Sequence, residues 1–319
     1  RMNEIRDEAA VHQSVAEASK RLLGWGITSL QEASPGNDPE RWDTFRRLIQ
    51  AEEIHQRLTV MPGIHYLRQF TERGLTYGVG DQHLRVGPAK LMATLTTGVL
   101  QPPEKEIRRL VLKAHRMGSP IAIHAVEQET ILAAARALIG AADTHHDGRY
   151  YRDRIEHCAE ATRKVLHLLD GSGVSIVTQP GFLYENGERY RAEVPCELQP
   201  WLYPLRSLEQ AKIPLAAGSD SPVASPNPWE GIYAAITRRC SSGEALNSEE
   251  GLTLGRALIL WTCGAAYASA EEKIKGMLRP GMLADFILMD RDITIIEPEE
   301  LLTCRVALTA VGGEVMWER

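Results

Sequence analysis

The chain has 319 residues, of which 44% are hydrophobic and 24% are charged, and its formal net charge is −6 at pH 7. Acidic and basic residues are interspersed, which excludes a strongly basic nucleic-acid surface and a polybasic membrane anchor. No apolar run approaches the roughly 18 residues of a membrane span, and five scattered cysteines without a CxxC pair argue against a disulfide framework. We therefore expect a cytoplasmic protein with a small-molecule partner, no nucleic acid and no membrane; whether it forms a homo-oligomer stays open.

Segments of helical and strand character alternate over most of the chain. Residues 5–23 carry apolar side chains on one helical stripe, and Gly24 and Gly26 follow as stop signals. Strands are then predicted at 26–32, 57–67, 84–95, 120–126, 152–158, 174–182 and 213–220. Helices are predicted at 38–50, 104–118, 128–142 and 161–173, and a less regular, proline-containing insert precedes the last of these strands.

This alternation predicts the fold class. Strands separated by helix-length segments imply an α/β protein with a parallel sheet and helical crossovers. Seven such strands fit a (β/α)8 TIM barrel that lacks its first strand in this chain. Residues 279–290 and 306–317 also have strand character, and Gly312-Gly313 divides the second segment as in a hairpin. We expect two domains: a barrel at residues 1–275, its N-terminal part missing, and a small C-terminal β appendage at 276–319, part of a composite β-sandwich.

Polar side chains recur where the predicted barrel strands end. Lys90 lies on the strand at 84–95, His124 ends "PIAIH", His157 ends "RIEH" and Asp220 follows "PLAAGS". The carboxyl ends of barrel strands surround the active site in this fold. Each residue alone has an ordinary alternative, such as a satisfied core histidine or a helix N-cap. Together they supply the nitrogen and oxygen donors that a borderline divalent cation prefers, and they predict a metal site.

The motifs "IAIHAV", "DRIEHC", "IVTQPGFL", "IPLAAGSDSPV" and "LRPGMLADFILMD" occur in this order over roughly residues 20–319. In order and spacing they resemble the metal-dependent amidohydrolase superfamily, and more narrowly the group that includes N-substituted formamide deformylases. The resemblance implies a hydrolase of non-peptide carbon–nitrogen bonds, such as N-acyl or formamide groups. It also implies a divalent metal cofactor, one or two ions, with zinc favoured.

The resemblance assigns roles residue by residue. It implies that His124 and His157 bind the metal, and that Asp220 binds the metal and shuttles the proton of the attacking water. We therefore expect Asp220 to be buried against a cation. Lys90 takes the position of a lysine that carries a carbamate bridging two metals, because a free ammonium has no lone pair to donate. The alternative for Lys90 is a lysine that reaches solvent at the barrel mouth.

Three further residues are candidates for substrate binding. Gln179 and Tyr184 come just after the predicted seventh strand of the full barrel, and His65 follows the third. The alternative for each is an ordinary packing position at the mouth of the barrel.

Two features depart from the family pattern. No His-x-His, which the family's first strand normally supplies as two metal ligands, occurs in this chain, and the adjacent His145 and His146 lie in a polar segment predicted to be a solvated loop. We therefore expect the sequence to be part of a longer protein, with a natural short form that has lost hydrolase chemistry as the alternative. Glu127-Gln128 stand where many relatives have Gly-Asp. A deaminase or cyclic-amide hydrolase and a non-catalytic barrel remain alternative functions.

Overall fold

The structure, a computed structural model, describes residues 8–95, 98–142 and 151–319, so the loop predicted at His145 and His146 lies outside the described residues. The helices are α1 Glu8–Gly24, α2 Pro39–Gln50, α3 Leu67–Glu72, α4 Glu104–Arg116, α5 Gln128–Ala142, α6 Arg163–Leu169, α7 Gly181–Glu193, α8 Leu205–Gln210, α9 Pro228–Thr237, α10 Leu254–Ile259 and α11 Ala265–Ala268. The strands are β1 Ser29–Glu32, β2 Arg57–Val60, β3 Leu84–Val86, β4 Ala89–Met92, β5 Ile121–Ala125, β6 Arg154–His157, β7 Ser175–Thr178, β8 Leu215–Ala217, β9 Phe286–Met289, β10 Val306–Val311 and β11 Glu314–Glu318. Among the described helices, none has the length and apolar character needed to cross a membrane.

The first eight strands are parallel and follow one another in chain order. They form two sheets, β1-β2-β3 and β4-β5-β6-β7-β8, joined by an isolated parallel bridge between Gly63 and Lys90. Within the described residues β1 and β8 each have one hydrogen-bonded neighbour. Parallel strands in sequential order with helical connections are the arrangement of a TIM barrel, which confirms the predicted fold class.

One predicted strand is divided in the structure. The segment 84–95 forms β3 and β4, separated by Gly87 and Pro88. A Cβ at Gly87 would approach the Thr59 side chain to 2.8 Å, so the backbone passes β2 too closely for a larger residue. Pro88 has no N–H to donate to a ladder. The strand therefore leaves β2 at this point and continues beside β5, which places Lys90 next to Ala122.

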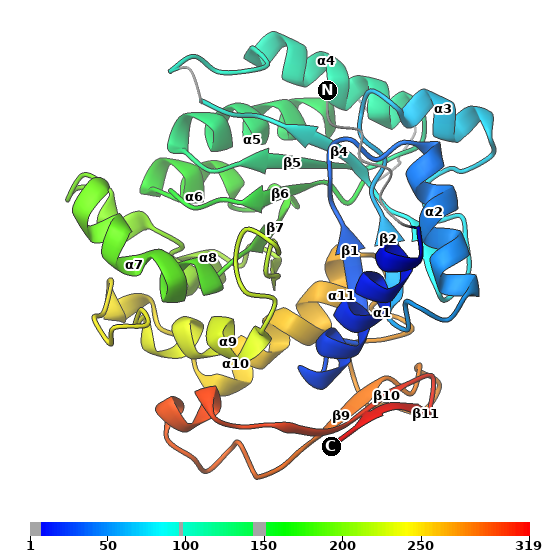
Figure 1. Cartoon of the computed structure of the whole chain (residues 1–319). Coiled ribbons are helices and arrows are strands. Elements are labelled where there is room, and N and C mark those ends of the chain that lie inside the picture. Colours follow the sequence, from blue (N-terminus) through cyan, green and yellow to red (C-terminus); the bar gives the residue numbers. More distant parts are fainter. Residues whose placement is uncertain (1–7, 96–97, 143–150) are drawn as a thin grey trace.

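Helices cover the outer face of the five-stranded sheet, as Figure 1 shows for α4, α5 and α6. In α4 the buried residues Ile107, Leu110, Val111 and Ala114 recur at helical spacing, while its other face carries charged residues. They pack with apolar residues of α5 and with outward-facing strand residues such as Ile123 and Ile155 in the largest hydrophobic core. This packing holds the strands in register and leaves their inward-facing residues to line the barrel.

The barrel interior contains buried charges as well as apolar side chains. Parallel register aligns Lys90 with Ala122 and Arg154, and His124 with Glu156. Arg154 and Glu156 are fully enclosed and form an ion pair with an Nε–Oε1 distance of 2.7 Å. Arg154 also donates to Gln31 Oε1 at 2.8 Å and to the Ala268 carbonyl at 2.7 Å. One arginine thus links β6, β1 and α11 across the barrel.

The three C-terminal strands form a separate antiparallel sheet in the order β11-β10-β9, which lies below α1, α9 and α10 in Figure 1. The predicted hairpin at Gly312-Gly313 is confirmed, because both glycines adopt positive φ, 63° and 86°, between β10 and β11. The strand predicted from residue 279 is wrong at its start: Pro280-Gly281 form a turn, and β9 begins at Phe286. The domain boundary at 275/276 stays a prediction.

A buried ion pair attaches this sheet to the barrel. Arg57 of β2 donates to both carboxylate oxygens of Asp285, at 2.7 and 2.8 Å, and the Gly312 N–H donates to the same carboxylate at 2.8 Å. Burial alone raises the pKa of Asp285, but the bonds from Arg57 and Gly312 outweigh it and hold this pKa below its ordinary value. The carboxylate form therefore stabilises the folded state.

We expect Asp285→Asn to lower the free energy of unfolding by about 2 kcal/mol at neutral pH, because a charge-assisted, bidentate pair is lost. A lowered folded-state pKa contributes stability above the unfolded pKa near 4, and the contribution disappears as the pH falls through the folded-state value. The difference from the parent protein should therefore be constant near neutrality and shrink below about pH 4. Urea unfolding at several pH values, with the exposed Asp292→Asn as control, measures this; a pH-independent difference would contradict it.

Candidate active site

Four residues predicted to bind metal come from four neighbouring parts of the barrel. Lys90 lies in β4, His124 in β5 and His157 at the end of β6, while Asp220 lies in the loop that follows β8. The imidazole rings of His124 and His157 are 4.4 Å apart between centroids and meet edge to face. Lys90 and Asp220 are close enough to His157 for their charges to affect its pKa. The structure thus brings the four residues to one end of the barrel.

The backbone at the end of β6 places His157 in this group. Ile155 faces the outer core, and strict alternation would direct His157 to the same side. Instead His157 and Cys158 both adopt left-handed backbone conformations, with φ of 73° and 52°. The Cys158 N–H donates to the Ala125 carbonyl at 3.0 Å, which holds this turn against β5. Such conformations cost roughly 1–3 kcal/mol per non-glycine residue and are concentrated at functional sites.

Both histidines are neutral near pH 7. Burial lowers the pKa of His124 to about 3, and the electrostatic influence of protonating His157 or Lys90 acts in the same direction. Burial also lowers the pKa of His157, although Asp220 and Glu156 act in the opposite direction. A neutral imidazole keeps one unprotonated nitrogen, which is the form that binds a metal ion. The site therefore offers two nitrogen donors without having to release protons first.

Lys90 is enclosed rather than solvated. Its residue exposure is 4%, which excludes the alternative of a lysine reaching solvent at the barrel mouth. Burial lowers the pKa of its amine, and Glu156 opposes this shift without cancelling it. A larger share of Lys90 is therefore the uncharged amine than for a lysine in water, and only that form is nucleophilic.

Asp220 differs from the prediction. It was expected to be buried, but β8 ends at Ala217 and the chain passes through Gly218 and Ser219 before reaching an exposed Asp220 with a φ of 56°. The apolar run and β8 both end at Ala217. The carboxylate of Asp220 therefore lies on the following loop and not at the tip of the strand. Partial burial of the carboxyl raises the pKa of Asp220, and His157 and Lys90 lower it by less.

The three predicted substrate-binding residues lie in different surroundings. Gln179 is buried, with 3% exposure, and its side chain contacts His157. Tyr184 is half-buried in α7 and meets Tyr233 edge to face at 5.9 Å. His65 is exposed and lies near Glu106 in the first turn of α4. Substrate contact stays a prediction for all three.

One residue near Lys90 was missed by the sequence analysis. Glu32 is the last residue of β1, and its charge raises the pKa of Lys90 against the effect of burial. The Ser34 N–H and the Asn37 amide donate to its carboxylate at 2.8 and 3.3 Å. The sequence contained a signal for Glu32, because it is a polar residue at the carboxyl end of a predicted strand. The same criterion identified His124 and His157.

The described donor side chains do not by themselves enclose a metal ion. In residues 8–95, 98–142 and 151–319, no group of three or more His, Cys, Asp or Glu side chains is arranged to hold a metal. His124 and His157 are adjacent, but Asp220 on its loop does not complete a three-residue cluster with them. A carbamate on the buried Lys90 would add two oxygen donors beside the imidazoles. In residue type alone, two imidazoles with a nearby carboxylate are donors that a divalent cation accepts.

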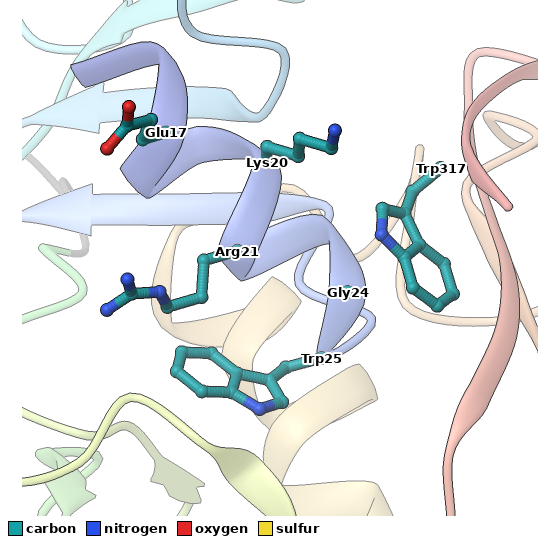
Figure 2. A pocket seen from close by; sticks show the side chains of 6 residues that line it. All are labelled: Glu17, Lys20, Arg21, Gly24, Trp25 and Trp317. Atoms are coloured by element: carbon teal, nitrogen blue, oxygen red, sulfur yellow. The ribbon is translucent and has the colours of Figure 1, made fainter. Parts of the chain in front are cut away.

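An open hollow of about 580 Å³ lies elsewhere, between α1 and β11, and is lined by Glu17, Lys20, Arg21, Gly24, Trp25 and Trp317 (Figure 2). The Trp317 indole lies against Gly24, where an added Cβ would be 3.4 Å from its ring nitrogen. None of the predicted site residues lines this hollow. We place the candidate active site at the barrel end, because titratable groups with altered pKa values gather there.

Comparisons with known proteins identify the family of the chain. A family model described as "Amidohydrolase family" matches residues 3–317. The N-substituted formamide deformylase of Arthrobacter pascens is 28% identical over 224 residues, covering 68% of this chain and 40% of that protein. This chain spans less than half the length of the curated relatives it matches.

Solved structures share the fold. An uncharacterized metal-dependent hydrolase from Pyrococcus horikoshii OT3 superposes with a TM-score of 0.78 and 22% identity, covering 92% of this chain and 63% of that chain. A zinc-bound adenosine deaminase from Xanthomonas campestris gives a TM-score of 0.63 and 16% identity, covering 98% of this chain and 70% of that one. These similarities confirm the barrel architecture inferred from the strand order.

Proposed function

The chain belongs to the amidohydrolase family, and on this premise we propose that it is a metal-dependent hydrolase of a non-peptide carbon–nitrogen bond. An N-acyl or formamide-type amide is the proposed substrate class. The observation that carries the proposal is the pair of neutral histidines, 4.4 Å apart between ring centroids, beside a buried lysine of lowered pKa. A formamide deformylase among the relatives supports the choice of substrate class.

The residues that would hold the metal are His124, His157, Asp220 and a carbamate formed on Lys90. Zinc is the favoured ion, because it accepts nitrogen and oxygen donors together. A bound divalent ion would supply an acidified water and would polarise the carbonyl oxygen of the substrate. The lowered pKa of Lys90 supports carbamate formation, since only its uncharged amine reacts with carbon dioxide.

Asp220 is the proposed general base and acid. Asp220 is exposed on the loop after β8, and His157 and Lys90 are near enough to lower the pKa of its carboxyl. We propose that it accepts the proton of the attacking water and returns it to the leaving nitrogen. Its raised pKa brings it closer to the operating pH, which favours transfer in both directions. Exposure also leaves the group accessible to a substrate arriving from solvent.

An assay of released products tests the reaction class. Purified protein with zinc and bicarbonate is incubated with N-substituted formamides, cyclic amides and aminopurines, and formate, ring-opened acid and ammonia are measured separately. Formate release that is lost with a chelator and restored by zinc supports the proposal. Ammonia release alone would assign a deaminase instead. Absence of turnover on all three classes in a metal-loaded sample would favour the non-catalytic barrel.

Metal content gives a further prediction. We expect one or two zinc ions per chain by elemental analysis. Close to two would support a carbamate on Lys90 as a metal ligand, and Lys90→Ala should then bind fewer ions. Lys113→Ala on α4 is the matched control and should not change the content. About one ion in the parent protein would instead favour a single-metal site of His124, His157 and Asp220. No bound ion would contradict the proposed function.

A further inference from the structure

The side chain of Gln179 is fixed by two hydrogen bonds at the end of β7. Its amide nitrogen donates to the Val177 carbonyl at 3.2 Å, and its amide oxygen lies 2.7 Å from Nδ1 of His157. Both contacts are buried. The Val177 carbonyl can only accept a hydrogen bond, so the amide must present its NH2 group to Val177 and its oxygen to His157. The acceptor at Val177 therefore determines the orientation of the amide.

This orientation determines which nitrogen of His157 carries the hydrogen. The amide oxygen of Gln179 has no hydrogen to donate, so the bond requires a hydrogen on Nδ1 of His157. In an imidazole with one ring hydrogen, Nε2 then keeps its lone pair. The ring itself is held in place, because His124 meets it edge to face at 4.4 Å and Phe182 stacks on it at 6.2 Å.

We propose that Gln179 is a positioning residue that fixes the Nδ1–H tautomer of His157, so that Nε2 is the nitrogen offered to a divalent cation. The use of this nitrogen as a metal ligand rests on the proposed function; the choice of tautomer does not. Gln179 thus acts through His157, and its burial leaves little surface for a substrate. A histidine that binds a metal through one ring nitrogen generally donates the hydrogen on its other ring nitrogen to an acceptor.

The tautomer is measured in metal-free protein by long-range 1H–15N correlation spectra of histidine-labelled samples near neutral pH. In the parent protein we expect His157 to show a protonated Nδ1 and an unprotonated Nε2. Gln179→Leu removes the acceptor and should shift the population toward the Nε2–H tautomer. Gln179→Glu retains an acceptor and should keep the hydrogen on Nδ1. His115, whose Nε2 faces the Asp153 carboxylate at 3.1 Å, is an internal reference that should not change and that reports an intact fold.

Zinc affinity is then measured by competition with a chromophoric chelator. We expect Gln179→Leu to bind zinc about 10–100-fold more weakly than the parent, and Gln179→Glu to bind within a few-fold of it. An unchanged His157 tautomer in Gln179→Leu would overturn the inference. If the tautomer changes as expected while the parent protein binds no zinc, the role of Gln179 stands and the proposed function fails. The two measurements therefore separate the inference from its premise.

Discussion

Asp220→Asn should lose turnover by about 10³-fold while keeping its bound metal. The amide has nearly the size of the carboxylate but cannot accept a proton from water and return it to the leaving nitrogen. The histidines and Lys90 remain, so metal content should be close to that of the parent. Steady-state kinetics with a formamide substrate, together with elemental analysis of the same sample, measure both quantities.

A matched control distinguishes this chemical effect from a change of charge. Asp170, exposed at the end of α6, is outside the four-residue group, and Asp170→Asn should leave turnover and metal content unchanged. Full activity in Asp220→Asn would exclude Asp220 as the proton carrier. Loss of activity together with loss of metal would make Asp220 chiefly a ligand, contrary to the proposed division of roles.

Glu156→Ala should lower the free energy of unfolding by about 3–5 kcal/mol. Glu156 is the carboxylate partner of Arg154 in the closed interior of the barrel, and the neighbouring positive charges keep its pKa low even though burial raises it. Its removal leaves a buried guanidinium without a counter-charge, next to Lys90. Urea unfolding followed by circular dichroism measures the change through the midpoint and the slope.

A double variant tests whether the cost arises from the unpaired charge. Arg154→Met combined with Glu156→Leu removes both charges and fills the space with apolar groups, so it should recover most of the stability lost in Glu156→Ala. If Glu156→Ala were destabilising only because alanine is smaller than glutamate, the double variant would be no more stable than Glu156→Ala. Equal losses in the two variants would contradict the electrostatic explanation.

The order of elements was predictable because local patterns carry it. The alternation of β-branched runs with helical stripes identified seven parallel strands, and the apolar positions of α4 recur at 3.6-residue spacing because one face packs on the sheet. Residues 312–313 marked the C-terminal hairpin because glycine adopts the positive φ of such turns at little cost. The break between β3 and β4 was not predictable, since it depends on how closely Gly87 passes Thr59 in another strand.

The candidate site was predicted in composition but not in geometry. Polar residues at strand ends pointed to Lys90, His124 and His157, because the carboxyl ends of parallel strands meet at one end of a barrel. The left-handed turn at His157, which brings its ring to His124, could not be predicted from the sequence. The contact between Gln179 and His157 could not be predicted either, because these residues are 22 positions apart and meet only when β6 and β7 pair.

The sequence by itself determined the fold class, the order of the strands and the residue types gathered at the barrel end, because these follow from local periodicity and from motifs read along the chain. The tertiary structure alone decided the environment of each group. Burial made Lys90 and the histidines weaker bases than in water, while the loop after β8 left Asp220 exposed against expectation. Solvation and hydrogen-bond partners depend on distant segments packed around a side chain, and that information is absent from any short stretch of sequence.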